Sequence, residues 1–213
     1  MYCVKSYNIV FTITVFILFI CTFQLKAESP YNSTWAKESL IFGSNVGFIL
    51  LSEELSYGAD TMTVADINAL DQSSINSFDR STASNWSPEI SEASDYLVAA
   101  TLVSPLTLFF SEKAREDVGT ITVMYLQTIL SSTFITSSIK SVSRVRPLAY
   151  NPDTPLEDKL SLKQDLRGSF PSGHTVWAFS SAAFLSTVYS DYYPDSDWTP
   201  FILGGSLLVA SSV

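Results

Sequence analysis

The stretch "VGTITVMYLQTILSSTFITSSI", residues 118–139, decides the fold class, because it runs for 22 residues without a charged side chain. That length and composition are typical of a helix rather than of a strand. Nine of the 22 residues are Ser or Thr. The sequence therefore leaves open whether this is a buried helix of a soluble bundle or a membrane helix whose hydroxyls face a bundle interior.

Working outward from this helix, three further apolar runs predict helices, at residues 96–110, 175–189 and 198–213. No segment shows strand-like alternation of useful length, so the sequence predicts an all-α protein, a helical bundle. A polar loop with four prolines covers residues 146–171. A long loop between two helices of a compact domain is a place where function is often found.

The segment before residue 95 is more polar. It contains four apolar residues at helical spacing, which predict a short amphipathic helix lying across the bundle: Ile67, Leu70, Ile75 and Phe78. The expected organisation is an N-terminal polar segment with this helix at residues 28–94, followed by a helical core at residues 95–213 that is incomplete at its C-terminal end.

The first 27 residues have the composition of a secretory signal peptide. A lysine-bearing start precedes an apolar run from Ile9 to Phe23, and the small residue Ala27 follows a short polar exit. We therefore expect cleavage after Ala27 and export. A retained N-terminal anchor helix is the alternative, although the run of about 15 residues is short for a full membrane span.

Charge and cysteine content exclude several classes of function. Both cysteines, Cys3 and Cys21, lie in the predicted signal peptide, so the exported chain would have no disulfides and no thiolate metal site. Cleavage would remove two lysines and no acidic residue, and so take the formal net charge from −9 to −11. Such a negative chain is not expected to have a nucleic acid as partner.

Basic residues nevertheless gather in one region. Six of the twelve lie between residues 140 and 167: Lys140, Arg144, Arg146, Lys159, Lys163 and Arg167. In an acidic chain this clustering favours an anion site, because arginine side chains donate paired hydrogen bonds to phosphate oxygens. The alternative is a solvated loop of mixed charge, since four carboxylates lie among them.

The stretch "SFPSGHT", residues 169–175, favours the anion site. Pro171 and Ser172 are typical of a helix start, and Ser172 and Gly173 would leave backbone N–H groups free at the positive end of the helix dipole. His174, the single histidine of the chain, would follow in the first turn, placed to give a proton to a leaving oxygen.

These residues resemble the type 2 phosphatidic acid phosphatase superfamily, which also contains bacterial acid phosphatases and vanadium haloperoxidases. Its signature is a lysine, six residues and Arg-Pro, then Pro-Ser-Gly-His, then Ser-Arg followed by a histidine and an aspartate. "SRVRP", ending at Pro147, resembles the end of the first part, and residues 171–174 match the second. The stretches "SFDRS" and "SDYLV" also resemble exported bacterial members, so the resemblance runs from about Ala65 to the end of the chain.

The resemblance implies metal-independent hydrolysis of a phosphate monoester, with no cofactor. It assigns His174 as the acid that protonates the leaving alcohol. It assigns the phosphate-binding role to a further set: Lys140, Arg144, Arg146, Ser172 and Gly173. Lys140 stands one residue later than the signature requires, which on a helix turns its side chain by about 100°. We therefore expect it to serve only through its flexible stem or a local distortion of the helix.

The third part of the signature, with the nucleophilic histidine, has no counterpart in the sequence. The resemblance therefore implies a truncated chain that holds half of an active site and is itself inactive. Two alternatives stay open: a haloperoxidase that binds vanadate, and a non-catalytic envelope protein that binds an anion or a lipid headgroup.

The substrate class also stays open between a lipid phosphate and a small ester. The apolar stretches at residues 40–51 and 96–110 favour membrane association in the cell envelope, with a membrane lipid as partner. A periplasmic location is the other exported form.

Overall fold

The computed structural model describes residues 29–57, 61–77, 79–142 and 144–213. Within these ranges every regular element is helical, which confirms the predicted all-α class. The predicted signal peptide and Phe78 lie outside the described residues.

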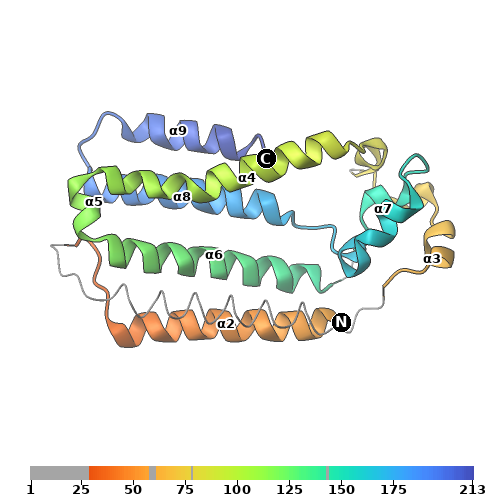
Figure 1. The fold of residues 1–213 in the computed structure, drawn as a ribbon, viewed down its shortest axis with the longest axis horizontal. Coiled ribbons are helices and arrows are strands. Elements are labelled where there is room, and N and C mark those ends of the chain that lie inside the picture. The colour runs from red at the N-terminus through yellow and green to blue at the C-terminus, as the bar shows by residue number, and fades with distance from the viewer. Residues whose placement is uncertain (1–28, 58–60, 78, 143) are drawn as a thin grey trace.

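The central helix is α6 (Val118–Lys140), whose bounds agree with the predicted run to within one residue. Two helices pack against it, α2 (Trp35–Tyr57) and α8 (Gly173–Tyr192). On the far side of α8 lie α4 (Pro88–Val103) and α9 (Thr199–Ala210), as Figure 1 shows. The result is an elongated bundle in which α8 contacts helices on both sides.

The predicted helix at residues 96–110 begins earlier than expected. Ser87 caps α4 by accepting a hydrogen bond from the backbone N–H of Ile90, and Pro88 occupies the first turn. The chain then tightens into the 3-10 helix η3 (Ser104–Phe110). The ring of Pro105 explains this change, because proline donates no backbone hydrogen bond and crowds the preceding turn.

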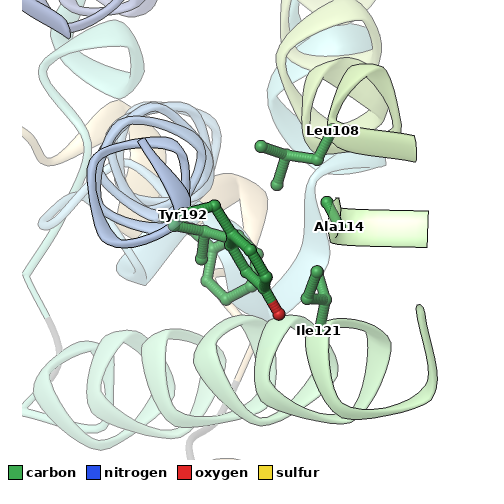
Figure 2. Close-up of a cluster of buried hydrophobic side chains, with 6 residues drawn as sticks. Leu108, Ala114, Ile121 and Tyr192 are labelled. Carbon is green, nitrogen blue, oxygen red and sulfur yellow. The ribbon is translucent and has the colours of Figure 1, made fainter. Parts of the chain in front are cut away.

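The largest buried cluster joins η3, α6 and α8 to the short helix α5 (Glu112–Glu116). Figure 2 draws this cluster and labels four of its members: Leu108, Ala114, Ile121 and Tyr192. The hydroxyl of Tyr192 donates a hydrogen bond to the buried carboxylate of Asp117 at the start of α6. This bond supplies the partner that a buried carboxylate needs.

The prediction of one amphipathic helix across the bundle is wrong. The segment forms the short helix α3 (Val64–Asn68) and two separate 3-10 turns, η1 (Gln72–Ser74) and η2 (Arg80–Ser84). The side chain of Asp71 accepts a hydrogen bond from the backbone N–H of Ser73 at 2.9 Å. Such local bonds compete with the helical ladder and start a new turn.

The same segment also lies elsewhere than expected. It sits at one end of the bundle beside α7 (Leu156–Ser161), at the right of Figure 1. Ile67 is buried there against Ala149 and Leu166 of the predicted polar loop. The apolar spacing thus identified a buried side chain although the helix itself is short.

The apolar stretch at residues 40–51 lies inside α2, where Phe42 packs against Val123 of α6. Helix α4 runs across residue 94, and the expected division of the chain at that residue stays a prediction. By length and composition, two helical stretches in the described part of the chain are suited to crossing a membrane, Pro88–Phe110 and Val118–Lys140.

The predicted polar loop is folded. It contains the 3-10 helix η4 (Pro147–Tyr150), the helix α7 and the 3-10 helix η5 (Lys163–Arg167). The buried side chains of Ala149 and Leu166 fasten η4 and η5 to the α3 segment. The loop therefore forms a compact cap at the end of the bundle where α6 ends and α8 begins (Figure 1).

Candidate functional site

The two motif segments of the sequence are joined side by side. The backbone N–H of Arg144 donates to the carbonyl of Arg167 at 2.7 Å, and that of Arg146 donates to the carbonyl of Leu166 at 2.9 Å. The backbone N–H of Ser169 donates back to the carbonyl of Arg144 at 3.0 Å. This short parallel pairing holds the chain just after α6 against the chain just before α8.

A pocket of about 350 Å³ opens where these segments meet the two helices. It brings together five of the six predicted site residues: Lys140, Arg146, Ser172, Gly173 and His174. The rest of its lining comes from α6, η5 and α8: Thr133, Thr136, Ser137, Asp165, Ser169 and Trp177. The fold thus brings these five residues together in one pocket, and their functional roles stay predictions.

Lys140 reaches this pocket despite its displacement by one residue. Its ammonium Nζ lies 3.3 Å from Oδ1 of Asp165. The guanidinium of Arg146 contacts the same carboxylate through Nη2, and its Nε donates to the backbone carbonyl of Asp165 at 2.8 Å. One aspartate therefore holds both cationic side chains that line the pocket among the described residues.

Gly168 leaves room for this arrangement. A Cβ at position 168 would lie 3.0 Å from Oδ1 of Asp165 and 3.4 Å from Cδ of Lys140. A larger residue would press on both side chains at once. The glycine thus permits the close approach of Asp165 and Lys140.

His174 lies in the first turn of α8, which Ser172 caps by accepting a hydrogen bond from the backbone N–H of Thr175 at 3.4 Å. The imidazole contacts α4 through both nitrogens. Nε2 lies 3.5 Å from Oδ1 of Asp95, and Nδ1 lies 3.4 Å from the hydroxyl of Ser94. The side chain is 41% exposed, so a ligand in the pocket has access to it.

Sequence reasoning missed Asp95 and Asp165 as site residues. The stretch "SDYLV" drew attention to the region of Asp95, but no spacing along the chain connects it to a histidine 79 positions later. Asp165 looked like one of four carboxylates in a solvated loop. Both became visible only when the fold brought distant segments together.

Arg144 is placed elsewhere. Its guanidinium pairs with the carboxylate of Asp79, and it does not line the pocket. Lys159 is buried and donates a hydrogen bond from Nζ to the carbonyl of Asn151 at 2.6 Å. Burial lowers the pKa of Lys159. Within the basic cluster, Lys140 and Arg146 therefore line the pocket, whereas Arg144 and Lys159 make contacts elsewhere in the fold.

A second pocket, of about 890 Å³, lies between α2, α6 and α8. Its lining includes the buried carboxylate of Glu38, to which the side chain of Gln127 donates a hydrogen bond at 2.7 Å. None of the predicted site residues lines it. The larger pocket is thus separate from the motif residues.

Comparison with known proteins finds a family match in the C-terminal part of the chain. Residues 121–213 match the family model of the PAP2 superfamily, whereas no curated protein and no solved structure matches the chain. The matched range contains all of α6 except its first three residues, together with the folded loop, α8 and α9. All six predicted site residues therefore lie in the part of the chain that is similar to the PAP2 superfamily.

Proposed function

We propose that the pocket at the end of the bundle serves the hydrolysis of phosphate monoesters. PAP2 superfamily membership supports a phosphatase-like function in broad terms. The observation that carries the proposal is the convergence of Arg146, Lys140 and the start of a 20-residue helix on one pocket that also contains His174. Cations and a helix N-terminus together favour a phosphate group.

In this proposal, the phosphate group is bound by positioning and charge. Arg146 and Lys140 donate hydrogen bonds to its non-bridging oxygens, and the backbone N–H groups of Ser172 and Gly173 face it at the positive end of the α8 dipole. These donors stabilise the negative charge that the oxygens carry in the transition state. No metal ion is required for this binding.

In this proposal His174 is the general acid, because the leaving oxygen needs a proton to depart as an alcohol. A nucleophile attacks phosphorus, the bond from phosphorus to the leaving oxygen breaks, and the proton of His174 passes to that oxygen to release the alcohol. Water then cleaves the phosphoenzyme, His174 takes back a proton, and inorganic phosphate leaves. The mechanism requires a second histidine as nucleophile. His174 is the single histidine of the 213 residues, so they do not contain the second one. We therefore assign no residue of these 213 as the nucleophile, and we expect the 213 residues alone to be inactive.

The surface of the bundle supports membrane association as part of the proposal. Large apolar side chains are exposed on neighbouring helices: Ile90, Tyr96, Val103, Leu106 and Phe110 on α4 and η3, Trp198 at the N-cap of α9, and Phe201, Leu203, Leu208 and Val209 on α9. Together with the two membrane-length helices, they favour a protein of the cell envelope that acts on a lipid phosphate or on a small ester at the membrane surface.

Hydrolysis by the protein as its gene encodes it tests the proposal. Phosphate release is measured with EDTA present, from glycerol phosphate and from p-nitrophenyl phosphate. We expect His174→Ala to lower kcat about 100-fold on glycerol phosphate and much less on p-nitrophenyl phosphate, because nitrophenolate leaves without a proton. Arg146→Ala should lower kcat/KM on both substrates by about 100-fold.

An exposed residue outside the pocket provides the control. Lys163→Ala removes one positive charge from the same loop and should leave both rates unchanged. Equal losses on both substrates for His174→Ala would remove that residue from the acid role. Absence of phosphate release combined with peroxide-dependent bromide oxidation in the presence of vanadate would replace the phosphatase with a haloperoxidase.

A further inference from the structure

The two cations of the pocket share a single carboxylate. Asp165 accepts from the ammonium of Lys140 with one oxygen and from the guanidinium of Arg146 with the other. All three side chains line the pocket. The donors that a phosphate group needs are therefore already engaged by an anion of the chain itself.

The backbone holds Asp165 in this place. Its N–H donates to the carbonyl of Leu162 at 2.9 Å, and its carbonyl accepts from the N–H of Gly168 at 2.9 Å and from Nε of Arg146 at 2.8 Å. The next residue, Leu166, is 1% exposed and anchors η5 in a buried cluster. The position of the carboxylate thus follows from the fold of the loop.

We propose that Asp165 is an internal competitor for the phosphate group and sets the affinity of the pocket for it. This inference rests on the phosphate site of the proposed function. The incoming phosphate takes over donors that Asp165 holds in the unliganded protein. The contact of Asp165 with Lys140, at 3.3 Å, breaks before its contact with Arg146, because Arg146 is also bound to the backbone carbonyl of Asp165.

Removing the charge of Asp165 distinguishes the role of competitor from a role in which Asp165 only positions the two cations. A carboxylate that contacts both cations repels a phosphate dianion bound at the same place, so its neutralisation should tighten phosphate binding. A carboxylate that only aims Arg146 and Lys140 would have the opposite effect, because its loss would let the donors move away. The sign of the change in affinity therefore distinguishes the two roles.

The experiment is calorimetric titration of the protein with inorganic phosphate, which needs no turnover. Asp165→Asn keeps the shape of the side chain and removes its charge. We expect it to lower the Kd for phosphate about tenfold. Asp158→Asn makes the same charge change on α7, away from the pocket, and should leave the Kd unchanged. An equal or weaker affinity of Asp165→Asn would overturn the proposal.

Two further variants separate this inference from the proposed function. Adding Arg146→Ala to Asp165→Asn should abolish the gain if the added affinity arises at this pocket. Persistence of the gain in the double variant would refute competition at Arg146. A gain that depends on Arg146, combined with hydrolysis that is insensitive to His174→Ala, would support the anion competitor and reject the catalytic role.

A structure of the unmodified protein with phosphate bound provides a readout that does not depend on folding of the variants. We expect the distance from Nζ of Lys140 to Oδ1 of Asp165 to open from 3.3 Å to beyond hydrogen-bond range. Phosphate bound in the pocket with that contact unchanged would show that the two anions do not compete.

Discussion

Nε2 of His174 lies 3.5 Å from Oδ1 of Asp95, and this contact joins the first turn of α8 to the middle of α4. The other ring nitrogen lies 3.4 Å from the hydroxyl of Ser94, the neighbour of Asp95. Two adjacent residues of one helix therefore contact both nitrogens of the imidazole. Such contacts restrict the orientation of the ring from which the proposed proton transfer takes place.

Asp95→Asn tests this relationship. If Asp95 orients the acid, the variant should lower kcat on glycerol phosphate about three- to tenfold and leave KM nearly unchanged, because a positioning contact matters in the proton-transfer step. Asp95→Glu should restore part of the rate. A rise in KM with constant kcat would instead place Asp95 in substrate binding.

Lys140→Met tests whether the displaced lysine contributes to anion binding. The methionine keeps most of the stem and removes the charge, so we expect the Kd for inorganic phosphate to rise about tenfold. Lys163→Met is the matched control, since Lys163 is exposed and does not line the pocket. Identical phosphate affinities for the two variants would exclude Lys140 from the site.

Lys159→Met tests the structural part of the basic cluster. The variant removes the hydrogen bond from Nζ to the buried carbonyl of Asn151. Leaving that carbonyl without its donor should lower the free energy of unfolding by about 1–2 kcal/mol. Urea unfolding measures the change, and the exposed Lys163→Met again serves as the reference. An unchanged midpoint would show that water replaces the ammonium.

Two tyrosines predict how stability depends on pH in alkaline solution. Burial, and a hydrogen bond from Tyr31 to Asp191, raise the pKa of Tyr31 above its usual value near 10. Burial and the bond to Asp117 raise the pKa of Tyr192 in the same way. Because the unfolded chain loses these protons first, their contribution to stability is complete below about pH 10 and is lost as the pH rises further.

Urea unfolding between pH 8 and pH 11.5 measures this loss. The free energy of unfolding should fall above pH 10, and Tyr31→Phe should make the fall less steep because one of the two protons is gone. Trp198→Phe, which changes an exposed aromatic side chain without a titrating proton, provides the comparison. Parallel curves for the unmodified protein and Tyr31→Phe would contradict the assignment.

The sequence predicted the helices best where charged residues mark their ends. Asp117 and Lys140 flank the uncharged run, and α6 begins and ends at these positions to within one residue. The helix predicted to continue past Asn68 is absent from residues 69–77, because the apolar spacing suited a helix while Asp71 offered the backbone a local alternative. The spacing of apolar residues indicates which side chains are buried. It does not indicate where a capping side chain interrupts the backbone hydrogen bonds of a helix.

The site was predictable to the extent that its residues lie in short motifs. Ser172, Gly173 and His174 are adjacent in sequence and share one helix start, so their neighbourhood follows from the chain. Asp95 and Asp165 depend on tertiary contacts between segments that no spacing rule relates. The contact of Arg144 with Asp79 could not be foreseen for the same reason.

The short parallel pairing of residues 144–146 with residues 166–169 has a consequence for how such a protein tolerates change in length. This pairing fixes the two points at which the chain leaves the bundle after α6 and rejoins it before α8. The segment between these two points can therefore change in length without moving its ends. Residues inserted near Asp153, an exposed position before α7, would lengthen only the segment between the two paired stretches. Such insertions would leave the separation in space between Arg146 and Ser172 unchanged.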